Sequence, residues 1–243
     1  MGVITDMINH QQFGHIKCVT FDLDDTLWPV GPTIIRAELK LYQWFEENYP
    51  QVSNTYTQED ITAKRMALQN TRSDIAHNVT ELRYCSLLEI ADEFGYSKTF
   101  AQEALKVFRN HRNQVEPFES SEAILSDLKQ HYILGAITNG NAQLDKTPVG
   151  KYFDFVVTAE EVGVSKPHPD MFNHASRLAN VEITNILHVG DCAQTDVLGA
   201  MSAGCKAVWF NQQRKPWPGG QSPHQVIHCL TELPAILNIQ NDT

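Results

Sequence analysis

The sequence lacks any long apolar run. Nothing in it approaches the stretch of about 18 residues that a membrane-spanning helix needs, and residues 1–13 have neither the basic nor the apolar region of a secretory signal peptide. It is also poor in positive charge, because 19 Lys and Arg stand against 29 Asp and Glu, a net charge of −10. An acidic surface repels nucleic acid and anionic lipid. We therefore expect a cytoplasmic protein that binds neither nucleic acid nor a membrane.

Cysteine is scarce as well. The five cysteines are scattered, form no C-x-x-C pair and have no histidine at the spacing of a zinc site. This pattern disfavours disulfides and structural zinc. With 11 Pro, 13 Gly and 42% hydrophobic residues in 243, the composition excludes collagen-like and wholly disordered chains. The length lies between one large domain and one domain that carries an insertion.

Short β-branched and aliphatic runs predict strands that alternate with helices. The runs lie at residues 16–21, 132–138, 155–158, 186–189 and 206–210. Helical patterns separate the later runs, at residues 121–130, 169–180 and 195–203. This alternation predicts an α/β fold with a parallel sheet that is covered on both faces.

The segment of residues 32–114 breaks the alternation, because it contains helical patterns and no clear strand. Apolar residues recur at helical spacing at Ile35, Leu39, Tyr42 and Phe45, and again between residues 82 and 94. We interpret these rows as packing faces within the segment. The expected organisation is a core domain of residues 1–31 and 115–243, with a helical domain of residues 32–114 inserted into it.

An acidic cluster follows the first predicted strand directly, in the sequence Asp22-Leu23-Asp24-Asp25-Thr26. Ligands bind at the carboxyl ends of the strands in parallel sheets. Side chains two apart in an extended segment point the same way, so Asp22 and Asp24 could meet one ligand. The alternative is a solvated acidic turn at a strand end.

Three later segments also carry polar groups after a predicted strand. Thr138 and Asn139 stand in the first, Lys166 in the second (SKPHP), and Asp191 and Asp196 in the third. Each segment alone could be an ordinary surface loop. Their joint occurrence at strand ends predicts one site, because the ends of parallel strands meet at one edge of the sheet.

The combined side chains indicate a particular chemistry. Clustered carboxylates need a cation, and oxygen ligands without His or Cys favour Mg²⁺ over zinc or copper. A lysine and a hydroxyl supply the side that binds an anion. Carboxylate, metal and lysine together can stabilise a phosphoryl group during transfer, so we interpret the site as one for phosphoryl transfer.

In motif order across residues 19–196, the sequence resembles the haloacid dehalogenase (HAD) superfamily of phosphohydrolases. DLDDT, ITN, SKPHP and HVGDCAQTD resemble its four motifs in order, and the helical insertion resembles its C1 type of cap. The resemblance implies a doubly wound, Rossmann-like parallel sheet with an inserted helical C1 cap. It also implies a Mg²⁺-dependent phosphatase of small phosphorylated metabolites.

The same resemblance implies catalytic roles. Asp22 would be the nucleophile that forms an aspartyl-phosphate, and Asp24 the general acid and base. Thr138, Asn139 and Lys166 would hold the phosphoryl oxygens.

A metal site is implied in the same way. Asp22, the backbone carbonyl of Asp24 and Asp191 would ligate Mg²⁺. Asp196 would either contact these ligands without binding the metal itself or orient Lys166.

Within the superfamily, residues 138–143 and 77–83 are similar to the bacterial flavin mononucleotide (FMN) phosphatases, which also act on the ribitylaminouracil phosphate of riboflavin synthesis. Such sequences often carry Asp or Ser where this one has Cys192. Trp28 could stack on a substrate ring, and Arg83 could meet a polar edge. The alternative for Trp28 is that it only packs its loop.

Several other activities stay open. Dehalogenating members of the superfamily lack the second aspartate of the first motif, so the presence of Asp24 favours a phosphatase. A phosphatase for phosphoglycolate or a sugar phosphate, a sugar-phosphate mutase and a catalytically silent phosphate-binding module are the alternatives.

Overall fold

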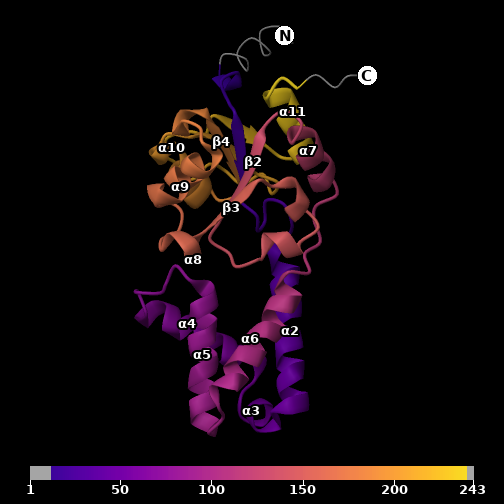
Figure 1. Ribbon diagram of the computed structural model, residues 1–243, viewed down its shortest axis with the longest axis vertical. Helices are drawn as coiled ribbons and strands as arrows, with labels where there is room; N and C mark the ends of the chain where they lie inside the picture. The colour runs from indigo at the N-terminus through magenta and orange to yellow at the C-terminus, as the bar shows by residue number, and fades with distance from the viewer. Residues whose placement is uncertain (1–11, 240–243) are drawn as a thin grey trace. The chain divides into compact units, whose positions relative to one another are not determined.

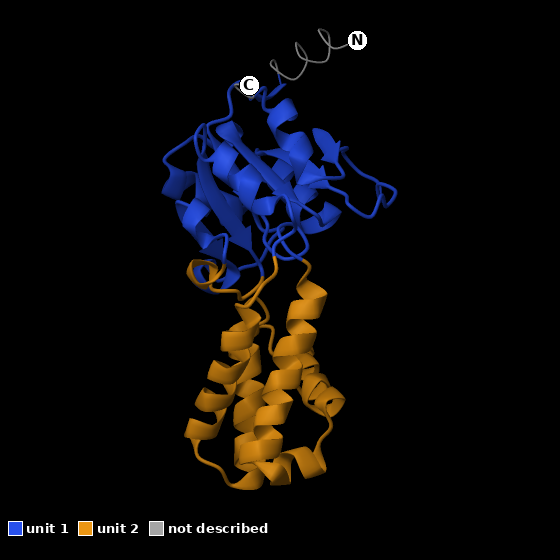
Figure 2. Ribbon diagram, turned by 90° about the vertical axis from the view of Figure 1, so that its right-hand side faces the viewer, with its two compact units in different colours: residues 1–28, 117–139, 148–243 blue, residues 29–116, 140–147 orange. Residues whose placement is uncertain are grey.

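The computed structural model describes residues 12–239 (Figure 1). The chain forms two compact units, coloured separately in Figure 2. The α/β unit contains residues 1–28, 117–139 and 148–243, and the helical unit contains residues 29–116 and 140–147. Residues 140–147 thus join the helical unit although they lie outside the insertion predicted at residues 32–114.

The α/β unit is built on a sheet of six parallel strands within the described residues, in the order β3-β2-β1-β4-β5-β6. The strands are β1 (Cys18–Phe21), β2 (Ile133–Thr138), β3 (Phe155–Thr158), β4 (Ile186–Gly190), β5 (Lys206–Phe210) and β6 (Gln225–Ile227). The predicted doubly wound parallel sheet is confirmed. The order runs outward from β1 in both directions, which places a topological switch point between β1 and β4, where α/β proteins bind ligands.

Helices cover both faces of this sheet, with α9 and α10 on one side and α7 and α11 on the other (Figure 1). The helical elements of the unit are α7 (Ser121–Leu128), η2 (Gly150–Tyr152), α8 (Ala159–Val162), α9 (Pro169–Ala179), η3 (Ile183–Asn185), the π-helix η4 (Ala193–Leu198), α10 (Gly199–Ala203), η5 (Leu230–Glu232) and α11 (Leu233–Ile236). The central strand β1 is buried along its whole length, as expected for a strand whose two faces are both covered.

The helical unit consists of α2 (Val30–Asn48), α3 (Pro50–Thr55), α4 (Gln58–Thr71), α5 (Val79–Phe94), α6 (Lys98–Arg112) and η1 (Leu144–Lys146). Local signals in the sequence set several boundaries. Pro50 opens α3, Thr57 and Asp60 form a capping box at the start of α4, and Gly95 ends α5 with φ of +72°. None of the helices in residues 12–239 combines the length and apolar character that a membrane crossing requires.

Hydrogen bonds explain why residues 140–147 belong to the helical unit. Asn113, just after α6, exchanges two bonds with Gln143, at 3.0 and 2.9 Å. Arg112 Nε donates to Asn141 Oδ1 at 3.2 Å. These contacts attach a segment that follows β2 to the end of a helix.

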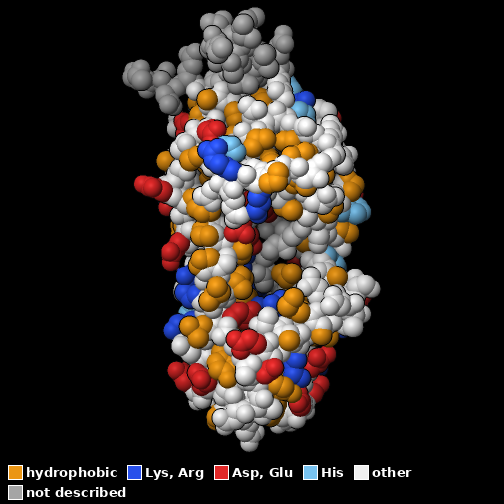
Figure 3. All heavy atoms as spheres, turned by 180° about the vertical axis from the view of Figure 1, so that it is seen from behind, with side chains coloured by type: hydrophobic (Ala, Val, Ile, Leu, Met, Phe, Trp, Pro, Cys, Tyr) orange, Lys and Arg blue, Asp and Glu red, His pale blue; other side chains and the backbone are white. Residues whose placement is uncertain are grey.

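The packing row predicted on α2 is partly wrong. Phe45 is buried, but Ile35 is 68% exposed and Leu39 44% exposed. The buried row contains Ala37 and Leu41 instead. Two apolar rows run along this helix, and packing against α6 selects the row with the small alanine. Exposed hydrophobic side chains are common on protein surfaces. Figure 3 shows such side chains among charged ones on the face that it draws.

This assignment predicts different costs for two truncations on the same helix. Leu41→Ala should lower the free energy of unfolding by about 2–5 kcal/mol, because it leaves a cavity in the core of the helical unit. The matched control Leu39→Ala should change it by less than about 0.5 kcal/mol. Urea unfolding followed by circular dichroism measures both, and equal costs would contradict the assignment.

Candidate active site

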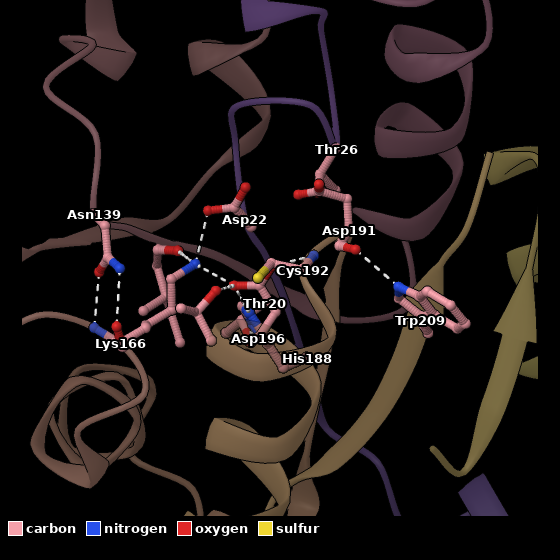
Figure 4. Close-up of polar contacts among 12 residues, drawn as sticks. Thr20, Asp22, Thr26, Asn139, Lys166, His188, Asp191, Cys192, Asp196 and Trp209 are labelled. Atoms are coloured by element: carbon pink, nitrogen blue, oxygen red, sulfur yellow. Dashed lines mark hydrogen bonds and ion pairs between the residues drawn. The ribbon is translucent and has the colours of Figure 1, made fainter. Parts of the chain in front are cut away.

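The side chains predicted to form one site gather at the carboxyl end of the central strands of the α/β unit (Figure 4). Asp22 follows β1, Asn139 follows β2, and Asp191 follows β4. Lys166 comes from the loop that precedes α9, and Asp196 from the π-helix η4.

Lys166 is the centre of this cluster. Its Nζ lies 2.7 Å from Asp22 Oδ1 and 2.7 Å from Asp196 Oδ1, and it donates to the carbonyl of Ile137 at 2.6 Å. The side chain is buried. Burial alone would lower the pKa of the Lys166 ammonium, but Asp196 and Asp22 together raise it above its ordinary value. Lys166 is therefore a permanent positive charge in the site.

Asp196 is held as the charged partner of Lys166. Its Oδ2 accepts a hydrogen bond from the backbone N–H of Cys192 at 2.9 Å, while Oδ1 faces Lys166. Burial works against the charge, yet Lys166 and His188 outweigh it and hold the pKa of Asp196 well below its usual range. Both oxygens of Asp196 are thus engaged by the protein.

Asp22 and Asp191 are in a different state. Burial raises the pKa of Asp22 well above its ordinary value, although Lys166 opposes the shift. Burial, with Asp196 and Asp25 adding to it, raises the pKa of Asp191 to about 6. Two carboxylates whose charge is disfavoured stand side by side, which is the electrostatic setting that a bound cation would relieve.

The geometry is suited to such a cation. One oxygen each of Asp22, Asp191 and Asp196 lies within 4.8 Å of the other two. A donor set of carboxylate oxygens fits a hard cation such as Mg²⁺. Because Asp196 is already engaged by Lys166 and by the backbone N–H of Cys192, Asp22 and Asp191 are the two side chains that could hold such an ion.

The loop that carries Asp191 is fixed from two sides. Trp209 Nε1 on β5 donates to the backbone carbonyl of Asp191 at 2.7 Å. Thr26 Oγ1, in the loop after β1, donates to Asp191 Oδ1 at 3.4 Å. The side chain of this acid is therefore positioned before any ligand arrives.

Asn139 and Thr138 were both predicted to hold phosphate. The amide of Asn139 is used on the backbone of Lys166: Nδ2 donates to the carbonyl of Lys166 at 3.0 Å, and Oδ1 accepts from its N–H at 2.7 Å. This pair of bonds locks the loop after β2 to the lysine loop. Thr138 ends β2 and is buried.

Asp24 lies in the loop that follows Asp22. Its Oδ1 accepts a hydrogen bond from Trp28 Nε1 at 2.8 Å, and the Trp28 side chain is completely buried. The contact gives Trp28 a defined partner inside the α/β unit and matches the packing alternative weighed for it.

Arg83, the other predicted specificity residue, belongs to α5 of the helical unit. Its guanidinium donates to both oxygens of Glu38, at 2.7 and 3.1 Å, and stacks 3.4 Å from the centre of the Phe108 ring. Arg83 is buried. These contacts are those of a residue that holds α5, α2 and α6 together.

Two residues beneath the site escaped prediction. Thr20 Oγ1 lies 3.0 Å from His188 Nδ1, and His188 Nε2 lies 3.7 Å from Asp196 Oδ1. Burial lowers the pKa of His188, although Asp196 beside it opposes the shift. A signal was present in the sequence, because Thr20 and His188 are polar residues inside apolar strands and face each other in the register of β1 with β4.

Comparisons with known proteins point to one family. A model for haloacid dehalogenase-like hydrolases matches residues 16–204. The chain is 34% identical over 236 residues to the 5-amino-6-(5-phospho-D-ribitylamino)uracil phosphatase YigB of Escherichia coli (strain K12), which covers 94% of this chain and 99% of the relative. It is 27% identical over 237 residues to the N-acylneuraminate-9-phosphatase of Mus musculus, with 91% and 94% covered.

A solved structure is similar over nearly the whole chain. It is described as a 2-haloacid dehalogenase from Pseudomonas syringae pv. Tomato DC3000, with a TM-score of 0.86 and 36% identity. The match covers 92% of this chain and 98% of that one.

The buried triad of Asp22, Lys166 and Asp196 predicts a stability effect. Lys166→Met should lower the free energy of unfolding by about 3–5 kcal/mol at neutral pH, because it leaves two buried carboxylates without their cation. Urea unfolding measures the loss, and added Mg²⁺ should restore part of it.

The matched control is Lys129→Met, which removes a partly exposed lysine paired with Asp154 in the same unit. It should cost no more than about 1 kcal/mol. Similar losses for the two variants would show that the buried triad has no special weight in folding.

Proposed function

This chain belongs to the haloacid dehalogenase-like hydrolase family, and we propose that it is a Mg²⁺-dependent phosphatase that acts on FMN or on the ribitylaminouracil phosphate of riboflavin synthesis. The placement of Lys166 between Asp22 and Asp196, with Asp191 alongside, is the observation that carries the catalytic part. Named phosphatases among the relatives support the same class of reaction.

Phosphate binding is the first task of the site. Lys166 and the Thr138 hydroxyl would bind phosphoryl oxygens. Mg²⁺ bound by Asp22, Asp191 and the carbonyl of Asp24 would neutralise the negative charge that the phosphoryl group brings. Asn139 takes part indirectly, because its two bonds to the backbone of Lys166 hold the lysine loop in place.

Transfer to the protein follows. A carboxylate oxygen of Asp22 attacks phosphorus as the ester P–O bond breaks, and the electron pair of that bond goes to the alcohol oxygen. The carboxyl group of Asp24 gives its proton to this oxygen, so the alcohol leaves neutral and Asp22 carries the phosphoryl group.

Hydrolysis completes the cycle. The Asp24 carboxylate takes a proton from water, and the water oxygen attacks phosphorus. The bond from phosphorus to Asp22 breaks with its electron pair returning to the carboxylate. Inorganic phosphate leaves, and both aspartates regain their starting states.

The substrate proposal rests on the relative of Escherichia coli, whose similarity extends over nearly the full length of both chains. The similar structure described as a dehalogenase raises dehalogenation as the rival activity. Asp24 speaks against it, because an alkyl halide has no leaving oxygen to protonate. A hydrogen bond from Trp28 Nε1 holds the carboxyl group of Asp24 in its loop. A carboxyl group at this position could protonate the leaving oxygen of an ester.

The catalytic proposal predicts the loss of activity in one variant. Asp22→Asn should reduce the hydrolysis of p-nitrophenyl phosphate in the presence of Mg²⁺ by about 10³-fold or more, because the amide is not a nucleophile. Chelation of the metal from the unmodified protein should also stop turnover, and Mg²⁺ should restore it. Release of p-nitrophenol measures each effect.

The control is Asp127→Asn on α7, which removes a carboxylate of the same unit outside the site and should leave the rate unchanged. If the unmodified protein with Mg²⁺ showed no turnover above background, a silent phosphate-binding module would replace the enzyme.

The substrate proposal predicts an order of specificity. Among FMN, ribitylaminouracil phosphate, phosphoglycolate and hexose phosphates, one of the first two should give the highest kcat/KM, measured as phosphate released. A higher value for phosphoglycolate or a hexose phosphate would contradict it. An isomerised sugar phosphate in place of free phosphate would identify a mutase, and halide release from 2-chloropropionate a dehalogenase.

A further inference from the structure

Trp209 is a buried tryptophan of β5 that contacts the backbone of the candidate metal site. Its side chain lies in the core of the α/β unit, and its Nε1 donates to the carbonyl of Asp191 at 2.7 Å (Figure 4). A buried indole N–H needs an acceptor. The acceptor that it takes here belongs to a residue whose side chain could hold a divalent cation.

The register of the sheet brings the indole to this carbonyl. β4 and β5 run parallel, and Gly190, the last residue of β4, pairs with Trp209. Asp191 is the next residue along the chain, where β4 has ended and η4 has not yet begun. Trp209 therefore reaches the first carbonyl beyond the end of the neighbouring strand.

This hydrogen bond holds one side of a peptide group whose other side is held as well. The carbonyl of Asp191 and the N–H of Cys192 belong to the same planar peptide group. Trp209 binds the carbonyl, and Asp196 Oδ2 accepts from the N–H at 2.9 Å. Rotation of this peptide plane would therefore break two hydrogen bonds at once.

The orientation of that peptide group bears on the Asp191 side chain. Gly190 is held in β4, so the Cα of Asp191 lies between a strand and a peptide group that is bonded on both sides. This arrangement fixes the direction in which the side chain leaves the backbone. One of its carboxylate oxygens lies within 4.8 Å of an oxygen of Asp22, the other side chain that could hold an ion.

A second tryptophan packs against the indole of Trp209. The ring centroids of Trp209 and Trp217 lie 5.1 Å apart, in an edge-to-face contact with an interplanar angle of 70°. Trp217 Nε1 is also buried, but it has no hydrogen-bond partner in the part of the chain that the structure describes. The two indoles therefore lie side by side and differ in whether the N–H has an acceptor.

We propose that Trp209 is a positioning residue for the divalent cation, because its N–H directs the Asp191 carboxylate through the peptide group that follows it. Loss of a partner that orients a metal ligand typically weakens metal binding by about 10–100-fold. The inference rests on the proposed function, in which Asp191 holds Mg²⁺. The affinity for the ion thus depends on β5, a strand that supplies none of the expected ligands.

The test is Trp209→Phe, which keeps an aromatic ring against Trp217 and removes the N–H. Mn²⁺ is the probe, since carboxylate and carbonyl oxygens suit it as they suit Mg²⁺, and electron paramagnetic resonance measures the Mn²⁺ that stays free. The Kd for Mn²⁺ should rise about tenfold. The matched control Trp217→Phe removes an N–H that has no acceptor, so it should leave the Kd unchanged.

Asp191→Asn shows that the ion is measured at this site, because the loss of a charged ligand should raise the Kd by more than Trp209→Phe does. A thermal melt without metal checks that each variant is folded, and Trp209→Leu takes the place of Trp209→Phe if that variant does not fold.

A merely structural role of Trp209 would lower the melting temperature and leave the Kd for Mn²⁺ unchanged. That result, or an equal rise in Kd for Trp217→Phe, would overturn the inference and leave the proposed function intact. Absence of Mn²⁺ binding by the unmodified protein, or unchanged binding in Asp191→Asn, would instead overturn the metal site of the proposed function.

Discussion

A single buried ammonium organises the site. Lys166 lies between Asp22 and Asp196 and holds Asp196 in its charged form, because the burial of an unpaired charge is costly. The lysine neutralises only one of the two. With Asp191 beside them, three carboxyl groups share one lysine, and a bound cation would favour the charged forms of Asp22 and Asp191.

Much of this could be predicted from the sequence. The alternation of strands and helices predicted the parallel sheet, and the rule that ligands bind at carboxyl ends predicted that Asp22, Lys166 and Asp196 would meet. Which groups each polar side chain contacts could not be predicted. Asn139 was expected on a phosphate, but its amide faces the backbone of Lys166. Loop conformation decides where a short amide points, and no periodicity encodes it.

Other features could not be predicted because they depend on how segments far apart in the sequence align. Thr20 and His188 are visible in the sequence as polar residues within apolar runs, but that they face each other depends on how β1 aligns with β4. The exposed row of Ile35 and Leu39 has a similar cause. The sequence of α2 offers two apolar rows, and the choice between them is made by the shape of the neighbouring helices.

The order of the strands also bears on how the chain is synthesised. β1 emerges first and becomes the centre of the sheet, yet its neighbours β2 and β4 follow only after the whole of residues 29–116. That segment is helical, so its secondary structure can form through local backbone hydrogen bonds before β2 and β4 are synthesised. During this interval β1 has no neighbouring strand, and Asp22, which follows it, has no lysine beside it. The fold thus leaves its central strand without either neighbour until β2 has been synthesised.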